Sequence, residues 1–273
     1  DWANRTLLSN SIYQYPLMGT PDKIAALSID DTKSIHRRFS NPNLAILVIT
    51  GKFNTVEVKK KIALHFSDIP TGASPKFRYR PLDLKSKSQL KTEQSEMIER
   101  NFIIYGLNAP SKLHMDYAAF QFMIYYLLDK RVGQIRHWLN TTNKLNAIVE
   151  YDFSDNIEAN RLIIRISSEK KIDIHTTKYV LSKNFGNLQN FFVSKRNNIR
   201  LIKTLMEVDY FKRKAGLKSR CEMLAKSEHI YSNLDLSKNV LSKIKRIDVQ
   251  DILRVCKRYF DVKNMVILYE DKK

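Results

Sequence analysis

The chain has 273 residues, 43% of them hydrophobic, and a formal net charge of +19 at pH 7. This composition excludes an intrinsically disordered chain, and no apolar run reaches the roughly 18 residues that a membrane-spanning helix needs. The excess of Lys and Arg favours an acidic partner, although an AT-rich genome would produce the same bias without such a role. Cys221 and Cys256 fall in helical patterns and are expected to be reduced thiols, with a disulfide left open at this point.

The first third of the chain predicts a helix, a buried strand and a second helix. The stretch "LSIDDTKSIHRRF" reads as a helix because Ser28 can cap its start and Asp31 follows three residues later. The "NPN" that comes next ends this helix. Leu44–Thr50, "LAILVIT", is apolar on both faces, which is typical of a strand covered on both sides. "TVEVKKKIALHF" then predicts an amphipathic helix.

The rest of the chain begins with a change of composition. Residues 76–100 are polar and basic, and we expect a connector that leads into an exposed strand. The expected elements after it are a strand "NFIIYGL", a long helix "LHMDYAAFQFMIYYLLDK", an antiparallel pair "LNAIVEYDFS" and "RLIIRISS", several helices, and a final strand "NMVILY". This order predicts an α+β fold in which a sheet packs against helices.

These segments resemble the insulinase/pitrilysin family of metallopeptidases, which includes mitochondrial processing peptidase and the core proteins of respiratory complex III. The likeness rests on "YPLMGTPDKIAAL", "FSNPNLAILVITGKFNTVEVKKKIALHFSDIP", "FIIYGLNAP" and "YAAFQFMIYYLLDKRVGQIRHWLN", and on the order and spacing of the elements. Lys52 departs from the Asp that is usual after the glycine. The resemblance implies one partial and one complete repeat: residues 1–75 as the C-terminal part of a first insulinase-type domain, 76–100 as a connector and edge strand, and 101–273 as a complete, catalytically inactive domain.

The resemblance also implies where the metal should be. Relatives that cleave peptides carry H-x-x-E-H on a helix, and its histidines help to hold zinc while its Glu activates a water. This chain has no such motif, and no two of its six histidines lie within five residues of each other. We therefore expect no catalytic residue and no metal ligand here. Zinc is expected only in a homologous half that is missing from this chain or belongs to a partner subunit.

Peptide-cleaving relatives often use an Arg after the long helix and a Tyr in the next strand to hold the substrate backbone. An ungapped match places Asn140 and Ala147 at these positions, whereas Arg136 and Tyr151 lie nearby but out of register. A small insertion would restore one of the two. If both are lost, the remaining task of the domain is architectural.

The most basic region runs from Lys195 to Lys226, with ten Lys or Arg against three acidic residues. A solvated helix face explains this region, and a docking patch for an acidic partner is the alternative. No groove-reading element or stacking aromatic accompanies it, so we expect no nucleic-acid binding. The candidate patch consists of Lys195, Arg196, Arg200, Lys203, Lys212, Arg213, Lys214, Lys218 and Arg220.

Three function classes follow. The first is the non-catalytic half of an insulinase-type zinc peptidase, which closes the peptide chamber that two such domains enclose. The second is a structural core-type scaffold subunit of a larger complex, and the third, weaker class is a binder of an acidic partner. An extended peptide could add to a sheet edge at "NFIIYGL" or "RLIIRIS", unless both strands are paired inside the sheet. Family resemblance implies a soluble protein of a bacterial or mitochondrial compartment.

Overall fold

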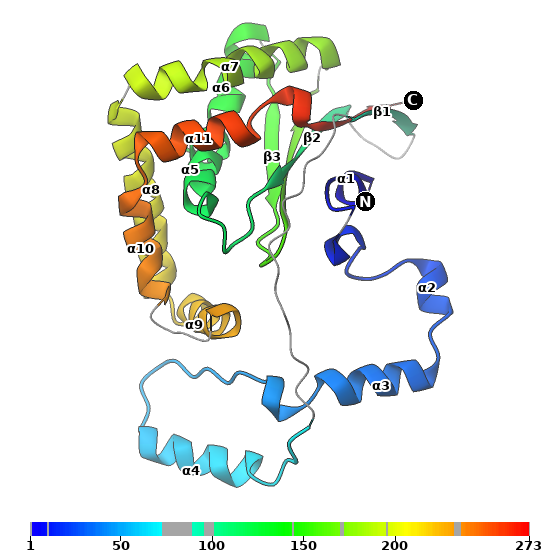
Figure 1. Cartoon of the computed structure of the whole chain (residues 1–273), viewed down its shortest axis with the longest axis vertical. Helices are drawn as coiled ribbons and strands as arrows, with labels where there is room; N and C mark the ends of the chain where they lie inside the picture. The colour runs from blue at the N-terminus through cyan, green and yellow to red at the C-terminus, as the bar shows by residue number, and fades with distance from the viewer. Residues whose placement is uncertain are drawn as a thin grey trace. The chain divides into compact units, whose positions relative to one another are not determined.

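The structure is a computed structural model that describes residues 2–9, 11–72, 89–95, 101–143, 145–169, 172–194, 196–231 and 236–272 (Figure 1). The chain divides into two units. The first unit comprises residues 1–17, 79–207 and 242–273, and the second comprises residues 18–78 and 208–241.

A five-stranded sheet organises the first unit. Its order is β1-β5-β2-β4-β3, with β1 and β5 parallel and the other neighbours antiparallel. In β4, buried side chains alternate with more exposed ones, as expected for a strand whose two faces differ. The five strands are β1 (Gln89–Ser95), β2 (Phe102–Ala109), β3 (Ile148–Phe153), β4 (Asn160–Ser167) and β5 (Val266–Lys272). The predicted α+β fold, a sheet packed against helices, is therefore confirmed.

One face of the sheet carries the main hydrophobic core. The core joins Ile103, Tyr105 and Leu107 of β2 to several helices, four of which lie wholly within the first unit on this face. Phe120 is fully buried at its centre, where its ring lies 5.3 Å from that of Phe260 and 5.9 Å from that of Phe153. The four helices are α5 (Tyr117–Leu128), α6 (Gln134–Asn143), α7 (Ile174–Ser194) and α11 (Val249–Tyr259). Eight of the twelve residues of α5 are buried, which explains why its sequence is apolar nearly all round.

A smaller cluster covers the opposite face of the sheet (Figure 1). Leu7 and Leu8, from the end of the N-terminal helix, pack there against Val266 of β5. Gly106 permits this approach, because a Cβ at that position would come within 2.8 Å of Leu7 Cδ1. The elements on this side are α1 (Trp2–Leu7) and the short η1 (Ile12–Gln14), and η3 (Val262–Asn264) leads into β5.

Both cysteines are free thiols, as expected. Cys256 is buried in α11, and this burial raises its pKa to about 12. Cys221 is partly exposed in α9 (Leu217–Tyr231) and donates a hydrogen bond of 3.3 Å to the carbonyl oxygen of Val48.

Helices α8 (Arg196–Ala215) and α10 (Leu236–Arg246) contribute residues to both units. The first half of α8 belongs to the first unit, in whose core Ile202 and Met206 are buried.

Most of residues 76–100 lie outside the described part, so the domain boundaries predicted at residues 75 and 100 stay predictions.

The second unit contains short helices around an extended segment. The predicted capping box is confirmed, since the Ser28 hydroxyl accepts from Asp31 N and the Asp31 carboxylate accepts from Ser28 N. Gly51, at φ 144°, begins the turn that leads to a helix capped by Asn54. The elements are α2 (Pro21–Ala25), α3 (Ile29–Phe39), η2 (Pro42–Leu44) and α4 (Thr55–Phe66).

The strand predicted at Leu44–Thr50 does not form within the described part of the chain. After η2, residues 45–50 have no regular secondary structure, because no described strand lies beside them to complete a ladder. Ile46, Leu47 and Ile49 are 40%, 58% and 42% exposed, although their sequence is typical of a buried strand. No described residue between 18 and 72 is buried, so this part of the second unit has no core of its own.

Candidate functional site

Within the described residues, no group of three or more His, Cys, Asp or Glu side chains could hold a metal ion. None of the described helices is long and apolar enough to cross a membrane.

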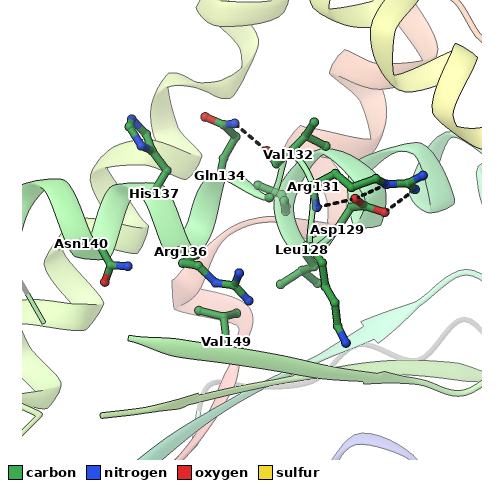
Figure 2. Close-up of a pocket in the computed structure, with 12 residues that line it drawn as sticks. Leu128, Asp129, Arg131, Val132, Gln134, Arg136, His137, Asn140 and Val149 are labelled. Carbon is green, nitrogen blue, oxygen red and sulfur yellow. Dashed lines mark hydrogen bonds and ion pairs between the residues drawn. The ribbon is translucent and has the colours of Figure 1, made fainter. Parts of the chain in front are cut away.

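A pocket of about 410 Å³ opens where α5 ends, between the start of α6 and the first residues of β3. Figure 2 shows the side chains around it. Leu128 and Val149 are apolar and buried, while most of the remaining lining is polar or charged. The lining residues are Leu127, Leu128, Asp129, Lys130, Arg131, Val132, Gly133, Gln134, Arg136, His137, Asn140 and Val149.

The only acidic side chain in this lining is already paired. Arg131 donates from Nη2 to Asp129 Oδ2 at 2.8 Å and from Nε to Asp129 Oδ1 at 2.9 Å, and its backbone N–H also donates to Oδ1. The side-chain hydrogen bonds from Arg131 lower the pKa of Asp129. Asp129 is thus a fixed part of the loop between α5 and α6.

Arg136 and Asn140 are four residues apart on α6 and extend to the same side of the helix, whereas His137 points away from them (Figure 2). Figure 2 places the Arg136 guanidinium above Val149 at the start of β3. Among the described residues Arg136 has neither a hydrogen-bond nor an ion-pair partner for its side chain. It can therefore bind a ligand without giving up an existing bond.

The structure brings the two family-matched positions together. Asn140 Oδ1 accepts a hydrogen bond of 2.8 Å from the backbone N–H of Ala147, which ties α6 to the residue before β3. Ala147 is 4% exposed and belongs to the core. Here the pair stabilises the α6–β3 connection, in which Asn146 adopts a positive φ of 48°.

Replacing Asn140 with Ala should lower the free energy of unfolding by about 1–3 kcal/mol, because the buried Ala147 N–H would lose its acceptor. Urea denaturation followed by circular dichroism measures this. Asn140→Asp keeps an acceptor oxygen and should retain most of the stability. Equal losses in both variants would contradict the hydrogen bond as the cause.

Arg136 and Tyr151, which lie near the family-matched positions but out of register with them, have different surroundings. Arg136 lines the pocket, while Tyr151 is 47% exposed on β3, on the same face as Val149. Lys130 lines the pocket although no sequence pattern predicted it, and Arg136 was not grouped with Asn140 from the sequence. Their spacing of four residues in a helix was the available signal.

The candidate basic patch falls into two groups. Lys195 lies outside the described residues, as does the side chain of Arg196. Arg200 and Lys203 belong to the first unit and line a second, open groove with Lys245. The other five lie in the second unit: Lys212, Arg213, Lys214, Lys218 and Arg220. All five are exposed, and a single docking patch stays a prediction.

Of the two alternatives left open for "NFIIYGL" and "RLIIRIS", a free sheet edge or pairing inside the sheet, the structure supports pairing. "NFIIYGL" becomes β2, which pairs with β4 and β5, and "RLIIRIS" becomes β4, which pairs with β2 and β3. Neither strand is therefore a sheet edge. The edges in the described residues are β1 and β3, and β3 lies beside the pocket.

A family model described as the peptidase M16 inactive domain matches residues 26–196. The match starts within the segment assigned above to a first domain. No curated protein matches the chain. Among solved structures, similar ones include a protease from Helicobacter pylori (TM-score 0.80, 15% identity), the peptidase M16 inactive domain from Pseudomonas fluorescens (0.81, 13%) and complex III2 from Candida albicans (0.77, 12%).

These alignments cover 98%, 99% and 98% of this chain and 69%, 63% and 64% of the other chains, so the chain spans about two thirds of their length. Identities this low show a shared fold only. The family model, however, covers more than half of the sequence. The predicted resemblance is therefore confirmed: the chain belongs to the peptidase M16 (insulinase-type) family, in which it matches the inactive domain.

Proposed function

We propose that the chain is the non-catalytic half of an insulinase-type zinc peptidase and closes its peptide-binding chamber. A zinc-binding half, supplied by another polypeptide segment or by a homologous subunit, completes the assembly. The observation that carries this proposal is the apolar surface of residues 18–72, none of which is buried in the described structure.

This surface favours a protein partner. Ile46, Leu47 and Ile49 are followed by Val56 and Phe66 of α4, all of them at least 40% exposed. Monomeric soluble domains rarely expose contiguous apolar patches of large size, and such patches mark interaction surfaces. The backbone N–H and C=O groups of residues 45–50 also have no strand partner among the described residues. A sheet supplied by the zinc-binding half would provide the missing hydrogen bonds.

The pocket beside β3 supports the peptide-binding part of the proposal. β3 is an edge strand in the described sheet, and an extended peptide can add to such an edge by backbone hydrogen bonds. In this arrangement the chain holds or encloses a peptide and supplies no catalytic group. Zinc chemistry belongs to the other half, whose H-x-x-E-H motif this chain lacks.

Zinc analysis and a peptide-cleavage assay test the proposal, first on this chain alone and then with a polypeptide that carries H-x-x-E-H from the same genome. We expect neither stoichiometric zinc nor turnover from the chain alone, and a stable complex with turnover after mixing. Stoichiometric zinc together with cleavage by the isolated chain would overturn the proposal.

A scaffold subunit is the second candidate function. The hydrogen bond between Asn140 and Ala147 favours it, because positions that hold peptide in active relatives serve the α6–β3 connection here. The similar fold in Candida albicans complex III2 is consistent with such a role. Affinity purification from the native organism separates the two: a membrane or respiratory complex supports the scaffold, and an H-x-x-E-H partner supports the peptidase half. The bacterial or mitochondrial location stays a prediction.

A further inference from the structure

We propose that the pocket between α5, α6 and β3 binds a carboxylate of an extended peptide, with Arg136 as the main contact. This inference rests on the proposed peptide-holding function and specifies the chemistry that the pocket selects. The carboxylate belongs either to an Asp or Glu side chain or to the C-terminus of the peptide.

The first argument is the charge of the pocket. Its lining contains Lys130, Arg131 and Arg136 against a single acid, Asp129. Asp129 already accepts three hydrogen bonds from Arg131, so it is not available to neutralise the others. Lys130 and Arg136 have no acidic partner among the described residues. The lining therefore carries an excess of two positive charges, before any charge on His137 is considered.

The second argument is the arrangement of donors. Asn140 Oδ1 is occupied by the Ala147 N–H, so its Nδ2 remains as a donor on the side of α6 that also presents Arg136 (Figure 2). Gln134 Nε2 is used differently, since it donates to the Val132 carbonyl oxygen at 2.7 Å. A planar guanidinium with an adjacent amide donor matches the two oxygens of a carboxylate.

The third argument is the pocket floor. Leu128 and Val149 are both buried and line the pocket below these donors. Arg136 itself is exposed, so a charge-assisted hydrogen bond to it is strengthened only where the ligand covers it against this apolar floor and excludes water. A ligand carboxylate that reaches the floor gains from this, whereas a neutral amide of the same shape does not gain the charge interaction.

The fourth argument identifies the ligand as a peptide. Ser154 N donates to Arg161 O at the end of the β3–β4 pair. Because hydrogen-bonded and non-hydrogen-bonded pairs alternate along antiparallel strands, the backbone groups of Val149 and Phe153 face away from β4. A peptide strand that pairs with this outer edge passes the pocket at Val149, where Arg136 lies above it (Figure 2).

Fluorescence anisotropy with the full chain and four N-terminally labelled, otherwise identical extended peptides tests the inference. One pair differs by an internal Glu or Gln with the C-terminus amidated, and the other pair differs by a free or an amidated C-terminus without acidic side chains. In one of the two pairs, we expect the peptide with the carboxylate to bind roughly 10–100 times more tightly than its neutral counterpart. This is the range for a hydrogen bond to a charged group. The pair that shows the difference identifies the source of the carboxylate.

Arg136→Gln should remove this preference and Arg136→Lys should restore part of it, with circular dichroism to confirm the fold of each variant. Arg5→Gln is the matched control, because Arg5 is an exposed arginine of α1 on the opposite face of the sheet. Equal binding of charged and neutral peptides, or an unchanged preference in Arg136→Gln, would overturn the carboxylate pocket while leaving the peptide-holding function in place. Failure of all four peptides to bind overturns the pocket too, and the half-peptidase proposal is then judged separately by complex formation with the H-x-x-E-H partner.

Discussion

Replacing Arg254 with Met should lower the free energy of unfolding by about 3 kcal/mol, because a buried carboxylate would lose its principal partner. The carboxylate is that of Asp116, at the start of α5, whose side chain is 1% exposed. Arg254 Nε of α11 donates to Asp116 Oδ1 at 2.7 Å, and the Tyr259 hydroxyl donates to Oδ2 at 3.3 Å. Arg254 also donates to Asp251 at 2.7 Å. Methionine preserves the packing of the side-chain stem and removes only the charge and the donors.

Substitution of the other partner, Asp116→Asn, should lower the free energy of unfolding by less. In Asp116→Asn, Arg254 loses one of its two acidic partners but keeps Asp251, and because its side chain is 38% exposed it regains hydration; asparagine also keeps the shape of the aspartate side chain. Urea denaturation of both variants and of the double variant gives the coupling between the two positions. Lys257→Met removes an exposed charge from the same helix and should change stability by less than about 0.5 kcal/mol. A loss in Lys257→Met as large as that in Arg254→Met would refute the buried pair as the cause.

Local patterns predicted a large part of the fold. The Ser28–Asp31 capping box and the apolar helix in "YAAFQFMIYYLL" depend on residues close in sequence, and both are confirmed. The antiparallel pair of β3 and β4 also follows from a short connection between alternating segments.

Long-range pairings could not be predicted in the same way. β1 pairs with β5 in parallel across more than 170 residues of sequence, and no local signal shows which strands become the sheet edges. The bond between Asp116 and Arg254 joins positions 138 residues apart. The candidate site has the same limitation: Asn140 and Ala147 were selected from family position, but their mutual hydrogen bond and the pocket around Arg136 depend on how α6 meets β3.

The segment Leu44–Thr50 is a different case: its sequence is that of a buried strand, but its surroundings in the described structure are not those of one. The pattern "LAILVIT" is typical of a strand buried on both faces, and the described structure leaves Leu47 58% exposed and the backbone without a strand partner. In the described part of the chain, hydrogen bonds from Cys221 Sγ to Val48 O and from Thr50 Oγ1 to Leu217 O join the segment to α9. The proposed zinc-binding half resolves the disagreement if it supplies the neighbouring strands.

Under that proposal, Leu47→Asp should weaken assembly with the zinc-binding half by roughly 100-fold or more, because the carboxylate would be buried without a partner. Ser34→Asp, on the polar side of α3, adds the same charge to the same unit and should leave assembly unchanged. Isothermal titration calorimetry measures both affinities. In hydrogen–deuterium exchange, the amides of residues 45–50 should exchange rapidly in the isolated chain and slow by roughly 1,000-fold in the complex, as expected for groups that enter a sheet. Assembly that tolerates Leu47→Asp, with exchange at residues 45–50 unchanged, would mean that the partner binds elsewhere and that this apolar segment is not completed by its sheet.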